Sequence, residues 1–146
     1  MFLKQHKIEQ LLGYFAAGTT KRTSSIIDMS GYDGVVFIAG LGTTIEAGTV
    51  DVYVEQNPAN SASGMARLAG QTAHTVTAAN ALLTQACVIV DVYRPQERYL
   101  QCNITPATQN AVILGITAIR YNGRVKPETN GASVLVSTSI SNPAEA

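Results

Sequence analysis

The stretch that most constrains the fold runs from Gln85 to Thr105, with the sequence QACVIVDVYRPQERYLQCNIT. Its first half is almost wholly apolar and its second half alternates apolar and polar residues, which is typical of β-strands because successive side chains point to opposite faces of a sheet. Pro95 lies between the halves, where its fixed φ and missing N–H favour a turn. The stretch predicts two strands paired as a hairpin, the first buried on both faces, with Ile89 opposite Cys102.

The rest of the chain continues this pattern of short strands separated by turns rich in Gly, Pro and Asn. Alternation is clearest over residues 49–55, and the apolar runs 35–39 and 111–121 predict core strands. Weaker strand candidates cover 23–29, 65–68 and 134–139, and residues 71–84 predict either a helical turn between strands or a strand and a loop. About seven to nine short strands without strand–helix alternation predict an antiparallel all-β sandwich, jelly roll or barrel.

The N-terminal residues differ from this pattern. Their apolar positions recur at spacings near three and four, which predicts a short amphipathic helix that ends before Gly18. So short a helix is marginal alone in water, so we expect it to dock either on its own domain or on a neighbouring subunit. We therefore divide the chain into an N-terminal arm or helix over 1–17, a β-sandwich domain over 18–140 and a flexible tail over 141–146.

Size and charge exclude several classes of partner. At 146 residues the chain is long enough for one domain with its own core, and its ten basic and ten acidic residues leave no basic footprint for nucleic acid. No apolar run is long enough to span a membrane, and the polar residues that directly follow Met1-Phe2-Leu3 argue against a secretory signal. We expect a protein made in a cytosol, without nucleic-acid or membrane partners, that uses part of its surface for subunit contacts.

The residues that most often carry chemistry do not form a recognisable motif. His6 and His74 are far apart and neither has a metal-ligand spacing, and the Gly40–Thr44 loop does not open a helix that would bind phosphate. We therefore predict no catalytic, cofactor-binding or metal-binding residues. The two cysteines, Cys87 and Cys102, are predicted to be buried free thiols, since they would be diagonal neighbours in the hairpin.

One carboxylate lies inside an apolar strand. Asp91 is expected to be buried and therefore to need a cationic partner, which Arg94, Arg98 or Arg120 could supply. A structural ion pair is favoured over catalysis, and we predict that Asp91, Arg94 and Arg98 fasten the turn of the hairpin.

Four segments together resemble one protein family. They are Ile27–Phe37 (IDMSGYDGVVF), Val90–Pro95 (VDVYRP), Glu97–Leu100 (ERYL) and Ile116–Tyr121 (ITAIRY). A turn of the form D-x-S-G-Y-x-G before an apolar strand, a strand beginning at Arg-Tyr and a later A-I-x-Y strand make the chain similar to the decoration, or cement, proteins of tailed bacteriophages.

The resemblance implies an antiparallel jelly-roll-like β-sandwich that self-associates as a dimer or trimer. It also implies attachment to the major capsid protein on the capsid exterior, with no catalytic residue or cofactor. A phage tail or baseplate component and a carbohydrate-binding β-sandwich are the alternatives, the latter disfavoured because the sequence has no Trp. The expected contacts with the lattice or a neighbouring subunit are the apolar residues of the arm: Phe2, Leu3, Ile8, Leu11, Leu12 and Phe15.

Overall fold

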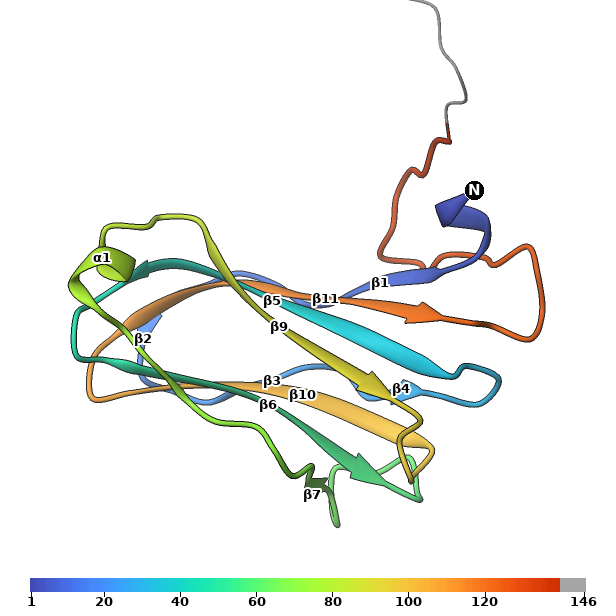
Figure 1. Ribbon diagram of the computed structural model, residues 1–146, viewed down its shortest axis with the longest axis horizontal. Helices are drawn as coiled ribbons and strands as arrows, with labels where there is room; N and C mark the ends of the chain where they lie inside the picture. Colours follow the sequence, from blue (N-terminus) through green and yellow to red (C-terminus); the bar gives the residue numbers. More distant parts are fainter. Residues whose placement is uncertain (140–146) are drawn as a thin grey trace, which may run out of the picture.

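The computed structural model describes residues 1–139 as two antiparallel sheets packed face to face (Figure 1). Sheet A, the upper layer in the figure, contains β1 (Lys7–Leu12), β2 (Phe15–Gly18), β5 (Gly34–Thr44), β9 (Ala86–Tyr93) and β11 (Ala111–Tyr121). Sheet B contains β3 (Arg22–Thr23), β4 (Ile27–Asp28), β6 (Thr49–Asn57), β7 (Ala66–Arg67), β8 (His74–Thr75) and β10 (Tyr99–Ala107). A 3-10 turn, η1 (Phe2–Lys4), and one helical turn, α1 (Ala78–Ala81), complete the structure.

The connectivity is that of a jelly roll. Sheet A has the order β1-β11-β5-β9 with β2 also on β11, and sheet B has the order β3-β10-β6-β7 with β4 also on β10 and β8 also on β6. When β1 with β2, β3 with β4, and β7 with β8 each count as one interrupted strand, the eleven strands become eight. The first then pairs with the eighth, the second with the seventh, the third with the sixth and the fourth with the fifth, as in one long hairpin rolled into a sandwich.

The core lies between the inner faces of the two sheets. Phe37 of β5, Leu100 and Ile104 of β10, and Ile113 and Ile116 of β11 are all fully buried there. Burying a side chain of this size stabilises the fold by roughly 1.5–3 kcal/mol. The predicted core strands at 35–39 and 111–121 are confirmed, and β5 extends further than its apolar run because Gly40 and Gly42 continue the ladder.

The predicted hairpin is wrong. Ile89 of β9 pairs with Ile38 of β5 in sheet A, whereas Cys102 of β10 pairs with Val54 of β6 in sheet B. The turn therefore carries the chain from one sheet to the other, and Arg94 begins the crossing with a positive φ of 50°. Alternation along a strand fixes which face each side chain takes, but it does not specify which strand lies alongside.

The predicted N-terminal helix is also wrong, because helical geometry there is confined to the single turn of η1. β1 and β2 pair with β11 and belong to the sandwich, so residues 7–18 are not a separate arm. A register shift between Gln10 and Leu12 breaks the alternation of β1. This irregularity lets Leu11 and Leu12 both pack on the core, which gives the sequence its helix-like spacing.

Gly115 lies beside this irregularity. It has a φ of 142°, and a Cβ atom there would lie 2.5 Å from the carbonyl oxygen of Leu12, so the close approach of β1 to β11 requires glycine. The residues 134–139, predicted as a last strand, form no ladder within the part of the chain that the structure describes. The predicted tail 141–146 lies outside the described residues.

Candidate interaction surfaces

Apolar side chains from β1, β5, β9 and β11 lie on the outer face of sheet A. Ile119 of β11 lies opposite both Ile8 and Val36, and Ile38 of β5 lies opposite Ile89. The side chain of Ile89 is 60% exposed. We call this surface the apolar face and define it by Ile8, Val36, Ile38, Ile89, Val112, Leu114 and Ile119.

Two glycines of β5 leave room on the apolar face for side chains from the neighbouring strand β11. A Cβ atom on Gly42 would lie 2.9 Å from Cγ1 of Val112, and one on Gly40 would lie 3.2 Å from Cβ of Leu114. The side chains of Val112 and Leu114 therefore lie across β5 instead of standing beside it. The result is a broad surface that has the shape and polarity of a contact face.

Asp91 is the one charged residue that β9 contributes to this face. Its Oδ1 accepts a hydrogen bond of 2.8 Å from the hydroxyl of Tyr121, whose ring crosses over Gly34. Burial and this hydrogen bond raise the pKa of Tyr121 to about 12. The expectation that Asp91 is buried is wrong, because β9 is the edge strand of sheet A and Asp91 points to solvent.

The predicted fastening of the turn by Asp91, Arg94 and Arg98 is also wrong, because the structure does not bring the three together. The Arg94 guanidinium stacks over the ring of Tyr93 at 5.1 Å. Arg98 forms a two-pronged ion pair with Asp28, with N–O distances of 2.8 and 2.7 Å. This pairing lowers the pKa of Asp28 to about 2, and the same carboxylate also accepts from the backbone N–H of Ser30.

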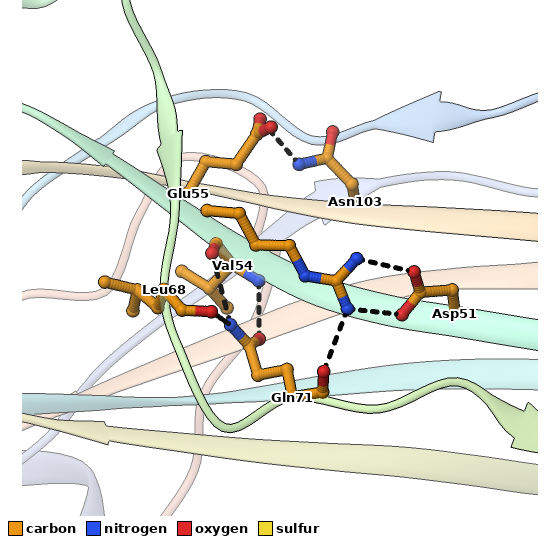
Figure 2. A network of polar contacts seen from close by, with 7 residues as sticks. Asp51, Val54, Glu55, Leu68, Gln71 and Asn103 are labelled. Carbon is orange, nitrogen blue, oxygen red and sulfur yellow. Dashed lines mark hydrogen bonds and ion pairs between the residues drawn. The ribbon is translucent and has the colours of Figure 1, made fainter.

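The outer face of sheet B is polar instead. Arg67 of β7 donates two hydrogen bonds to the Asp51 carboxylate, at 2.7 and 2.9 Å (Figure 2). Its guanidinium also lies 4.2 Å from the Tyr53 ring centroid. Asn103 donates to Glu55 at 2.9 Å, so neighbouring strands are joined by side chains as well as by their backbones. The polar groups of this network satisfy one another, which makes the surface well hydrated and less suited to tight burial against a partner.

Gln71 connects this network to the sheet. Its side-chain amide accepts from the backbone N–H of Val54 at 2.7 Å and donates to the carbonyls of Val54 and Leu68 at 3.3 and 2.9 Å (Figure 2). The amide thus takes the place of a missing strand residue between β7 and β8 along the edge of β6.

A groove of about 430 Å³ runs along one open side of the sandwich, between β9 and the β7 region. Arg67, Leu68 and Gln71 line one wall, and Asp91 and Tyr93 belong to the other. The side chain of Tyr93 is 57% exposed.

The six expected contact residues of the N-terminal segment separate into two groups. Leu11, Leu12 and Phe15 pack against the hydrophobic core of their own domain, and Phe15 is covered by the Arg22 guanidinium at 4.1 Å. Of the others, Ile8 belongs to the apolar face, Leu3 is half-buried, and Phe2 is 54% exposed and stacks on His6 with ring centroids 4.0 Å apart.

Arg120, considered from the sequence as a partner of Asp91, forms a buried ion pair with Glu9 instead. Arg120 points inward from β11 and is 5% exposed, where it contacts Glu9 and donates to the carbonyl of Asp28 at 2.6 Å. Its guanidinium also lies 4.8 Å from the ring centroid of Tyr32. The signal was the alternation of β11, which places Arg120 on the same side as the buried Ile116 and Ala118.

The prediction for the cysteines holds for only one of them. Cys102 is fully buried, which raises the pKa of its thiol to about 12, whereas Cys87 lies exposed on the edge strand.

Within residues 1–139, no three His, Cys, Asp or Glu side chains gather as a metal site would require. The same residues contain no helix long and apolar enough to cross a membrane.

Among the comparisons with known proteins, the one with solved structures finds matches. No family model matches the sequence, and no curated protein matches it. Among solved structures, the chain is similar to dimeric latent PorU from Porphyromonas gingivalis, at 12% identity and a TM-score of 0.45 over 80% of this chain. The chain spans 12% of the PorU chain, and a likeness at this distance supports no conclusion about its role.

Proposed function

We propose that this protein is a structural binding module that attaches to the exterior of a tailed-phage capsid and stabilises the head. The observation that carries the proposal is the contrast between its two outer faces. The apolar face of sheet A leaves side chains such as Ile89 and Leu114 in solvent at 60% and 44% exposure, whereas sheet B presents a satisfied polar network. A contiguous apolar surface of this kind marks a contact site on a protein that is otherwise well hydrated.

The size of the apolar face fits a contact that is repeated many times. Four strands about 4.8 Å apart and about 30 Å long cover roughly 600 Å². A stable pairwise interface buries about 800 Å² on each partner. One copy would therefore bind weakly, and linked copies on a regular lattice would bind firmly through their combined contacts.

Such binding would stabilise the head by mass action. A protein that binds the assembled lattice and not the free subunits shifts the equilibrium toward the assembled state. The major capsid protein is the partner that the sequence resemblance favours, and the jelly-roll sandwich is compatible with that assignment. No catalytic residue is required of a protein that acts by burial alone.

A charge placed on the apolar face tests the proposal. Leu114→Lys should lower the occupancy of undecorated capsids at least tenfold in a co-sedimentation assay, because the ammonium group must be desolvated on docking. Ala107→Lys adds the same charge on the outer side of β10 in sheet B and serves as the matched control, with wild-type binding expected. Equal binding by the two variants would exclude the apolar face as the contact, and binding to purified tails instead of capsids would assign the protein to the tail.

The groove beside β9 favours carbohydrate binding as a second candidate. The exposed Tyr93 and the carboxylate-bearing Asp91 both belong to its lining, and they offer a stacking surface and a hydrogen-bond acceptor for a sugar. A glycan array decides this, because a hit that Tyr93→Ala abolishes supports the groove and an array without hits removes it.

A further inference from the structure

Sheet A has one long edge that nothing covers in the described chain. β9 is the terminal strand of the sheet, eight residues long, and residues 1–139 show no backbone hydrogen bond to it other than those from β5. An open edge of this length presents a row of free N–H and C=O groups to which another strand can add.

The other edges of the sandwich are protected. Next to β1, the side chains of Asn130 and Ser133 accept from the backbone N–H groups of Ile8 and Gln10 at 3.1 and 2.8 Å, and the N–H of Gly131 donates to the carbonyl of Ile8 at 3.0 Å. The two edges of sheet B consist of strands of two residues each, β3 with β4 and β7 with β8. β9 contains no Pro, Gly or Lys, the residues that commonly block edge pairing, and Asp91 is its one charge.

The C-terminal segment 134–139 follows these contacts and begins with three apolar residues, but it forms no ladder in the described chain. Its sequence, VLVSTS, is uncharged. The side chains of Leu135 and Val136 are 93% and 81% exposed. After the contacts with β1, the N–H of Val134 donates to the carbonyl of Gly131, and the segment turns away from both sheets (Figure 1).

We propose that residues 134–139 of one copy add as a strand to β9 of a neighbouring copy. A neighbour fits better than the same chain, because the segment is anchored beside β1 and three strand spacings, about 14 Å, separate β1 from β9. Within one chain, the segment would have to cross the sheet before it could pair. Between copies, the donor edge of one molecule meets the acceptor edge of the next, and such a head-to-tail contact gives a ring when its rotation closes and an open filament when it does not.

The side chains of the segment fit the two surfaces that meet at β9. In a strand, the side chains of Val134 and Val136 lie on the face opposite to that of Leu135. With Leu135 outward, it extends the apolar face beyond Ile89. Val134 and Val136 then cover the groove, where the inner side of β9 leaves Val90 incompletely buried. Both apolar sets lose contact with water in this arrangement.

The oligomeric state of the purified protein, in the absence of capsids, tests this pairing separately from lattice binding. Light scattering coupled to gel filtration should give a multiple of the monomer mass for the wild type. Removal of the chain from residue 134 onward leaves the contacts with β1 intact and should give the monomer. Ile89→Lys on the edge strand should also give the monomer, whereas Leu114→Lys, on the same face but on an inner strand, should keep the oligomer.

A monomeric wild type, or a truncated protein that keeps the oligomeric state of the wild type, would overturn the proposal. Cross-linking then identifies the partner strand through the exposed thiol of Cys87. Oxidised Leu135→Cys should form disulfide-linked oligomers that Cys87→Ser abolishes, and Val136→Cys, on the other face of the segment, should not. A disulfide within one chain would show that the segment pairs with its own β9 and would equally refute exchange between copies.

Discussion

The buried ion pair between Arg120 and Glu9 gives a quantitative test of how the sandwich is held together. Their side chains are 7% and 22% exposed, so both charges are largely removed from water. Replacing Arg120 with Met leaves Glu9 half-buried without its cation and leaves the carbonyl of Asp28 without a donor. Breaking a buried pair costs about 3 kcal/mol, and the lost carbonyl bond adds about 1 kcal/mol.

The expected loss for Arg120→Met is therefore about 4 kcal/mol, which lowers Tm by roughly 8–16 °C in a chain of this size. The double variant Arg120→Met with Glu9→Leu removes both charges and should recover to within about 1 kcal/mol of the wild type. Urea unfolding followed by circular dichroism measures all of these free energies.

A matched control separates burial from charge pairing as such. Arg67→Met breaks the ion pair with Asp51, in which the side chains are 39% and 23% exposed, and it should cost about 1 kcal/mol or less. The reasoning fails if Arg120→Met costs no more than this control. It also fails if the double variant loses as much as the two single variants together.

Two further outcomes follow from the polar contacts. The pKa of Asp28 is lowered from 3.8 to about 2 by its pairing with Arg98, so the folded state binds a proton less readily than the unfolded state. This carboxylate stabilises the fold above about pH 4 and ceases to do so as the pH falls through about 2, so Asp28→Asn should show a weaker loss of stability over that interval in acid titrations of urea unfolding. Gln71→Ala should cost about 1–3 kcal/mol, because the N–H of Val54 loses its partner. An unchanged melting curve would contradict the role of that amide.

The sequence was sufficient to identify the strands that alternate or remain apolar without interruption. Residues 49–55 were predicted nearly as they occur because their period of two is undisturbed. Residues 111–121 were predicted from their apolar run, although the register of β11 shifts near Gly115. The pairing of β9 with β10 was predicted wrongly because a short turn between two strands is equally compatible with a hairpin and with a crossing between sheets. Only the ladder partners, Ile38 for Ile89 and Val54 for Cys102, distinguish the two.

The N-terminal segment shows where periodicity fails. The irregularity of β1 puts Leu11 and Leu12 on the core together, which a regular strand forbids and a helix allows. Gly115 permits the close approach of the two strands, but its contact partner, Leu12, is distant in sequence. The consequence for β1 was therefore not predictable from local pattern.

The ionic contacts were predictable in kind but not in partner. Asp91 was expected to be buried because its neighbours are apolar, but the outer face of β9 is exposed. The hydroxyl of Tyr121 on β11, and not an arginine, donates to its carboxylate. Arg98 pairs with Asp28 because β4 lies beside β10. The distances along the chain, 70 and 111 residues for the Arg98 and Arg120 pairs, exceed what a local reading of sequence can connect.

The rolled connectivity also decides when this protein can fold during its synthesis. Lys7 pairs with Arg120, so β1 leaves the ribosome roughly 110 residues, or about 6–20 s, before its partner strand exists. β5 likewise sits between β9 and β11, both of which are made later. Sheet A therefore cannot close until nearly the whole chain has emerged, and the nascent protein passes through a long interval in which its core strands are unpaired and depend on chaperones for protection from one another.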